Sequence, residues 1–213
     1  AMSLALTGAP LVLAPAPVQA QQVSAFMQSV AEAASSSKVL SEFYRANGYK
    51  PVFTDNSARA KARRQALLRA VNAAPEKGLA PYDTSLLVAN LRAIKSDRDL
   101  GRAEVAMAQL FLDYARDIQT GQLVPSRIDS GLVRQVPYRD GLAVLTNFTK
   151  SNPQAYLRKL EPSSPEYARL LKEKANLEQV LGKGGWGQTV PGSKYEPGDS
   201  GNGVVILRNR LMA

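Results

Sequence analysis

Apolar residues recur at three- and four-residue spacing through most of the chain, which is the pattern of helices that bury one face. The clearest segment runs from residue 102 to 120, and Gly121 follows it where a glycine commonly ends a helix. Further helices are predicted over residues 37–47, 58–74, 84–94, 141–149, 154–160, 164–181 and from 203 onward. The pattern therefore predicts a mainly α fold, a compact helical domain with a few short strand-like segments such as 49–53.

Changes in composition divide the chain further. Residues 1–20 are uncharged and apolar, and Val18 and Ala20 supply small residues at positions −3 and −1 before Gln21, as at a signal-peptidase site. We interpret 1–20 as the remnant of a secretory signal peptide, with an Ala/Pro-rich disordered leader as the alternative. Residues 21–37 are expected to form a linker or a frayed helix, and 38–181 the helical domain. A Gly/Pro-rich crossing, 182–202, leads to the start of a second unit at 203–213.

The chain is strongly basic, with 27 Lys and Arg against 18 Asp and Glu, a net charge of +9 and a pI near 9.9. This balance favours acidic partners such as nucleic acid, anionic lipid or a cell-wall polymer rich in carboxylates, although a solvated basic surface is an equal alternative. The basic residues are dispersed, and no exposed aromatic residues are interleaved with them. We therefore expect no nucleic-acid partner. No segment is long and apolar enough to predict a transmembrane span.

The sequence contains neither cysteine nor histidine among its 213 residues. Catalytic Cys–His and Ser–His–Asp arrangements and the usual zinc-ligand sets are therefore excluded. We expect no catalytic residue, no metal and no cofactor in this chain, which would then not be an enzyme. The helix from residue 203 reaches the last residue without a stop signal, so we interpret the chain as the front part of a longer protein.

Four residues are candidates for a binding site. Tyr114, Arg116 and Asp117 lie together on the strongest helix, where they would form the wall of a groove. The structural alternative is that Asp117 or Arg116 holds the following turn at 121–125 by hydrogen bonds. Trp186, the only tryptophan, lies in the Gly-rich crossing and either stacks on a sugar ring or packs against the domain it leaves. Asp113 and Asp117, one turn apart with an arginine between them, favour an ion-pair surface over a pair of catalytic carboxylates.

Several stretches, taken in order, resemble the N-terminal scaffold region of the large periplasmic murein L,D-transpeptidases. The matching pieces are 43–44, 47–53, 73–79, 81–82, 104, 111–117, 121, 125, 185–186, 191–192, 197–199 and 204–211. The resemblance implies that 203–213 is the opening helix of a peptidoglycan-binding module. It also implies a later catalytic domain with a histidine and a Ser-His-Gly-Cys run, neither of which is present here. Such proteins are periplasmic in Gram-negative bacteria and form 3→3 crosslinks between the stem peptides of peptidoglycan.

We therefore expect a non-catalytic, periplasmic scaffold that positions the wall-binding and catalytic modules of an L,D-transpeptidase. Its partners would be peptidoglycan or its stem peptides, and the catalytic domain of the same protein. The alternative is an exported basic helical adaptor that binds a protein or an anionic polymer. A carboxylate-only glycan hydrolase is a third hypothesis, which requires two acidic groups facing each other across a cleft.

Overall fold

The computed structural model describes residues 24–133, 137, 139–192 and 194–212. These residues form ten α-helices and one 3₁₀ helix, and no strand is present among them. The helices are α1 (Ala25–Ala34), α2 (Lys38–Ala46), α3 (Ala58–Asn72), η1 (Ala74–Lys77), α4 (Ser85–Arg92), α5 (Asp97–Thr120), α6 (Pro125–Ile128), α7 (Gly141–Lys150), α8 (Pro153–Leu160), α9 (Pro165–Gly182) and α10 (Asn202–Met212). The mainly α fold predicted from the sequence is confirmed.

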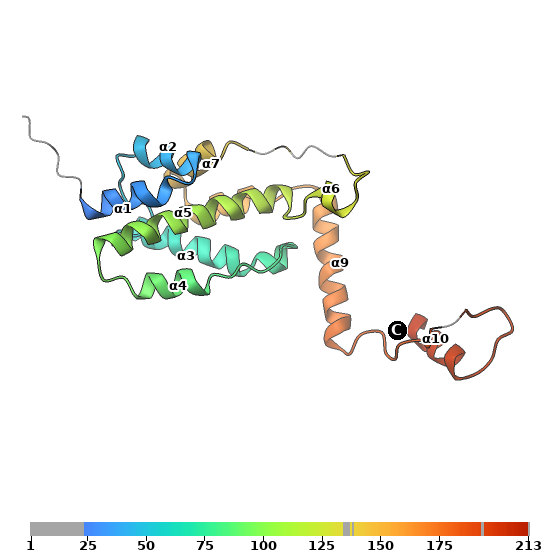
Figure 1. Cartoon of the computed structure of the whole chain (residues 1–213). Helices are drawn as coiled ribbons and strands as arrows, with labels where there is room; N and C mark the ends of the chain where they lie inside the picture. The colour runs from blue at the N-terminus through green and yellow to red at the C-terminus, as the bar shows by residue number, and fades with distance from the viewer. Residues whose placement is uncertain (1–23, 134–136, 138, 193, 213) are drawn as a thin grey trace, which may run out of the picture.

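Helix α5 is the centre of the helical body, and it contacts α1, α2, α3, α4, α7 and α8 (Figure 1). It begins five residues earlier than its apolar pattern suggests. Ser96 and Asp99 form a capping box, in which the Ser96 hydroxyl accepts from the Asp99 amide at 3.2 Å and the Asp99 carboxylate accepts from the Ser96 amide at 3.0 Å. These bonds satisfy free amides of the first turn and extend the helix over a charged segment.

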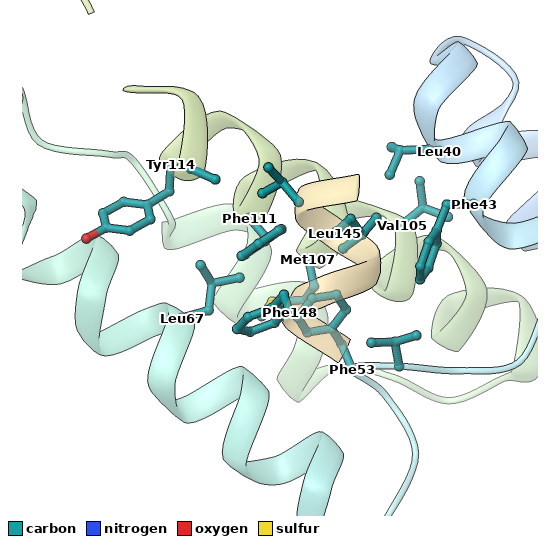
Figure 2. Packing of buried hydrophobic residues seen from close by; sticks show 14 of the residues in the cluster. Leu40, Phe43, Phe53, Leu67, Val105, Met107, Phe111, Tyr114, Leu145 and Phe148 are labelled. Carbon is teal, nitrogen blue, oxygen red and sulfur yellow. The ribbon is translucent and has the colours of Figure 1, made fainter. Parts of the chain in front are cut away.

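Aromatic rings from α5, from α7 and from the loop between α2 and α3 stack on one another in the core. The ring centroids of Phe111 and Phe148 lie 4.2 Å apart, and those of Phe148 and Phe53 lie 6.0 Å apart, both pairs stacked (Figure 2). All three side chains are fully buried. Burial of each such side chain contributes roughly 1.5–3 kcal/mol, so this stack is a main source of stability for the packing of α7 on α5.

Residues 25–34 form a capped helix that packs on the body, so of the two alternatives expected for 21–37, a linker or a frayed helix, the described residues contain a helix. Helix α1 packs along α5 at Gly101, where an added Cβ would lie 2.8 Å from the Ser29 Cβ atom and 2.9 Å from the Phe26 carbonyl oxygen. The Ser29 hydroxyl also donates to the Arg98 carbonyl at 2.8 Å. The small residues that suggested a linker are what allow the two helices to approach this closely.

The strand-like segment expected at 49–53 does not form a strand. It consists of turns and bends that run between α2 and α3. The reason is that its amides bond to a buried side chain, Glu104 of α5, and not to a neighbouring strand. The other strand-like segments that the sequence suggested are likewise absent from the described residues.

Helix α9 leads away from the helical body, and the crossing after it continues to α10 (Figure 1). The crossing consists of turns and irregular chain in its described residues, and the helix predicted from 203 is present as α10. Neither α9 nor α10 buries a residue. None of the helices in the described segments has both the length and the apolar character needed to span a bilayer. The signal-peptide prediction for 1–20 lies outside the described residues.

Candidate functional site

Three of the four candidate residues come together near the C-terminal end of α5. The Asp117 side chain is 6% exposed and accepts two hydrogen bonds, from the Tyr82 hydroxyl at 2.7 Å and from Arg116 Nε at 2.8 Å. Arg116 also forms an ion pair with Asp113, with Nη1 and Oδ1 3.4 Å apart. The Tyr82 and Tyr114 ring centroids lie 6.4 Å apart. These contacts link the loop before α4 to the last two turns of α5.

The electrostatics of this cluster favour a fastening role. Burial, reinforced by the hydrogen bond to Asp117, raises the pKa of Tyr82 well above its ordinary value, so the phenol remains a proton donor. The same carboxylate raises the pKa of Arg116. Asp117 is thus an acceptor that stabilises one neutral donor and one cation, and both of its oxygens are occupied by bonds within the protein.

Under the structural alternative, Asp117 or Arg116 was expected to hold the turn at 121–125 by hydrogen bonds. The structure places its side chain on Tyr82 instead, so it fastens the loop before α4, and only its backbone carbonyl accepts from the Gly121 amide, at 2.8 Å. The loop is held a second time where the Gln122 side chain accepts from the Ala80 amide at 2.7 Å. The hydrogen bonds of the Asp117 side chain are therefore made within the protein, but they hold a different segment from the turn that was predicted.

Arg116 also lines a cavity of about 280 Å³ bounded by the N-terminal ends of α2 and α7 and by α5. The walls are mainly apolar, with Val39, Leu112 and Val144 among the lining residues. Tyr114 and Asp117 do not line this cavity. Of the three residues predicted to form a groove wall, only Arg116 therefore lines this cavity.

Tyr114 lines a different hollow, of about 620 Å³, between α3, α5 and α8. Figure 2 shows its ring at the edge of the core, with the hydroxyl directed away from the other labelled side chains. Burial, assisted by the negative charge of Glu161, raises the pKa of Tyr114 to about 12. The side chain is 2% exposed, so the residue is chiefly a core residue whose hydroxyl reaches the wall of the hollow.

Trp186 lies apart from this cluster, in the crossing beyond α9, and is 36% exposed.

The third hypothesis, a pair of catalytic carboxylates, gains no support from α5. Asp113 and Asp117 both pair with the same arginine on one helix and do not face each other across a cleft. Among the described residues there is also no group of three or more acidic side chains close enough to hold a metal ion.

Among the described residues, the side chain that accepts the most hydrogen bonds is that of Glu104, whose burial was not predicted from the sequence. Glu104 is 0% exposed and accepts from the amides of Val52 at 2.8 Å, Phe53 at 3.0 Å and Thr54 at 2.8 Å. The hydroxyls of Tyr44 and Thr54 donate to it at 2.9 Å and 2.8 Å. The available signal was its position, because residues 104, 108, 111 and 115 fall on one helical face and the other three are apolar.

The same loop is held from its other side by two arginines of α3. Arg63 donates to the Val52 carbonyl at 3.0 Å, and Arg64 donates to the Phe53 carbonyl. The amides of residues 52–54 are therefore bound by a carboxylate, and the carbonyls of Val52 and Phe53 are bound by guanidinium groups. Side chains satisfy here the backbone groups that a sheet would otherwise pair.

A family model described as "Scaffold domain" matches residues 38–173, which is more than half of the chain. The chain belongs to this family. The match covers α2 to the first half of α9, and so includes both buried carboxylates and the loops that they hold. No curated protein matches the chain, and no solved structure does.

Proposed function

We propose that this chain is the non-catalytic scaffold part of a murein L,D-transpeptidase, located in the periplasm of a Gram-negative bacterium and acting in peptidoglycan crosslinking. The observation that carries the proposal is the match of the helical body to the Scaffold domain family. The in-order resemblance of the sequence to the scaffold region of the large periplasmic enzymes supplies the parent activity. That resemblance extends beyond the matched residues into the crossing and α10.

The internal bonding of the body suits this role. Its two buried acidic side chains, Glu104 and Asp117, both accept hydrogen bonds that join α5 to loops distant in the sequence. Groups engaged in this way maintain shape and are unsuited to proton transfer with a substrate. On this proposal the body is a rigid support, and its partners are peptidoglycan or its stem peptides and the catalytic domain of the same protein.

The direct test uses the purified chain and soluble muropeptides, with products separated by chromatography and identified by mass spectrometry. We expect neither 3→3 crosslinked dimers nor trimmed stem peptides. A catalytic L,D-transpeptidase domain, added as a positive control, should form dimers under the same conditions. Appearance of a 3→3 dimer with this chain alone would overturn the proposal.

The alternative is an exported basic adaptor that serves a protein partner or an anionic polymer, which the net charge of +9 favours. The gene sequence beyond codon 213 discriminates between the two. An in-frame continuation encoding a Ser-His-Gly-Cys run supports the scaffold of a transpeptidase, whereas a stop codon at that point favours the adaptor.

A further inference from the structure

Two hollows flank the corner where α7 ends and α8 begins. One, of about 470 Å³, lies against α8, and the other, of about 400 Å³, opens toward the N-terminal half of α3. Lys150, Ser151 and Asn152 line both hollows. The two hollows therefore form a continuous concave surface with these three residues at its centre.

The charge of this surface has one sign. Its exposed cations are Arg59, Arg139, Lys150 and Lys159, which we call the basic corner. No Asp or Glu lines either hollow, and none of the four cations forms an ion pair with another described residue. Arg63, which lines the hollow beside α3, has a lowered pKa, first because of burial and then because of the charge of Arg59, with Asp55 opposing in part. The four exposed cations are thus gathered on one surface without an ion-pair partner among the described residues.

The frame beneath the basic corner is fixed by internal bonds. Arg63 donates to the Thr149 carbonyl at 2.6 Å and so ties α3 to the end of α7. The Asn152 side chain accepts from the Ala155 amide at 3.0 Å, which caps α8. The Tyr156 hydroxyl donates to the Val144 carbonyl at 3.0 Å, which ties α8 to α7. A ligand would therefore meet cations mounted on a preorganised surface, which reduces the entropy lost on binding.

We propose that the basic corner binds a peptide that carries two or more carboxylates. This inference rests on the proposed function, under which the peptide is a peptidoglycan stem. The polar groups between the cations, on Asn147, Ser151 and Asn152, suit peptide amides as well as carboxylates. The four cations provide charge-assisted hydrogen bonds to the carboxylates.

Other anionic partners fit the surface less well. A bilayer needs a convex or flat surface with apolar side chains to insert, and none of the exposed large hydrophobic residues of the described chain lies between residues 139 and 160. Single-stranded nucleic acid needs aromatic rings available for stacking. Among the residues that the structure describes, Tyr156 is the one aromatic residue that lines the two hollows, and it is partly buried with its hydroxyl bonded to α7.

The test measures binding of a soluble muropeptide to the full chain by calorimetry, at low salt and then at 0.3 M salt. The variants are Lys150→Gln and Lys159→Gln, singly and together. Lys172→Gln, on the exposed surface of α9, is the matched control because it removes the same charge outside both hollows. All three lysines are exposed, so the variants should fold, and circular dichroism melting checks this.

We expect each single substitution in the basic corner to weaken binding roughly two- to fivefold, and the pair to weaken it roughly tenfold. Lys172→Gln should bind as the unmodified chain does. Amidation of the muropeptide's carboxylates should weaken its binding to the unmodified chain by at least as much as the double substitution weakens binding of the native muropeptide. Higher salt should weaken all carboxylate-dependent binding.

Three results would overturn the inference. The first is equal binding by the double variant and by Lys172→Gln, which would show that net charge alone is sensed. The second is equal binding of the amidated and native muropeptides. The third is tighter binding of single-stranded DNA or of phosphatidylglycerol vesicles than of the muropeptide. Each leaves the proposed scaffold role standing, because that role is tested separately, by the crosslinking assay and by the gene sequence beyond codon 213.

Discussion

Substitution of Glu104 by glutamine tests whether the buried carboxylate organises the fold. Both carboxylate oxygens act only as acceptors, for three amides and two hydroxyls. A glutamine of the same shape keeps one oxygen and places an NH₂ group where the other was. That NH₂ group would face N–H and O–H donors, so either the Val52–Phe53 side or the Thr54 side of the loop would lose its acceptor.

The magnitude follows from these contacts. Hydrogen bonds to a charged group contribute about 1.5–3 kcal/mol each, and a buried donor left without a partner costs about 1–3 kcal/mol. With about two donors orphaned, we expect Glu104→Gln to lower the free energy of unfolding by about 3–5 kcal/mol. For a chain of this length that corresponds to a fall in Tm of roughly 6–20 °C.

Urea denaturation followed by circular dichroism measures the loss directly. Glu42→Gln is the control, because Glu42 is 44% exposed and pairs with Lys38 at 3.9 Å, which predicts a change below about 0.5 kcal/mol. Thr54→Val removes one hydroxyl donor to the carboxylate and leaves the amide bonds in place, so it should cost about 1 kcal/mol. If Glu104→Gln were as mild as Glu42→Gln, the carboxylate would not be holding the loop and the reasoning would fail.

Three further predictions concern α5 and its neighbours. Asp117→Asn should lower the free energy of unfolding by about 1–3 kcal/mol and speed hydrogen exchange in the loop before α4. Asp113→Asn is the control and should change neither quantity by much. Equal effects of the two substitutions would contradict the role of Asp117 in holding this loop. Gly101→Ala should destabilise by about 1–3 kcal/mol in a thermal melt because α1 must move, while Gly182→Ala, which has open space, should not destabilise. The pKa of Tyr114 is raised to about 12 in the folded chain, so its contribution to stability is complete below the unfolded pKa of about 10 and is lost as pH rises toward 12. Between pH 10 and 12, the free energy of unfolding measured in urea should therefore fall by about 2 kcal/mol less for Tyr114→Phe than for the unmodified chain. The same pH profile for both proteins would refute this.

The helices could be predicted from the sequence because their apolar stripes repeat with the helical period and because their caps are local. Ser164 accepts from the Tyr167 amide at 3.2 Å, and Asn152 caps α8 in the same way, and both are residue types that favour the start of a helix. Helix α1 was predicted only as one of two alternatives, a frayed helix, because its apolar pattern is diluted by alanine and serine. What places it is a close approach to Gly101, some seventy residues later, which no local pattern encodes.

The candidate site was predicted only in part for a similar reason. Proximity of Arg116 to Asp117 follows from their being neighbours in the sequence, and the ion pair was anticipated. The partner that gives Asp117 its role, Tyr82, lies 35 residues earlier and is brought in by the tertiary fold. Glu104 shows the same limit, since three of the five donors that it binds are backbone amides, which carry no sequence signature at all.

These buried contacts bear on where the function of the domain resides. The loop at 52–54 has no strand beside it, so its fold depends on Glu104 for its amides and on Arg63 and Arg64 for its carbonyls. Each of these charged groups is occupied by the protein's own backbone and is unavailable to a ligand. The exposed cations of the basic corner, in contrast, have no such engagement and stand on the frame that Arg63 fixes at Thr149. On the two proposals made above, the first set of charges builds the support, and the second set, on its surface, binds a partner.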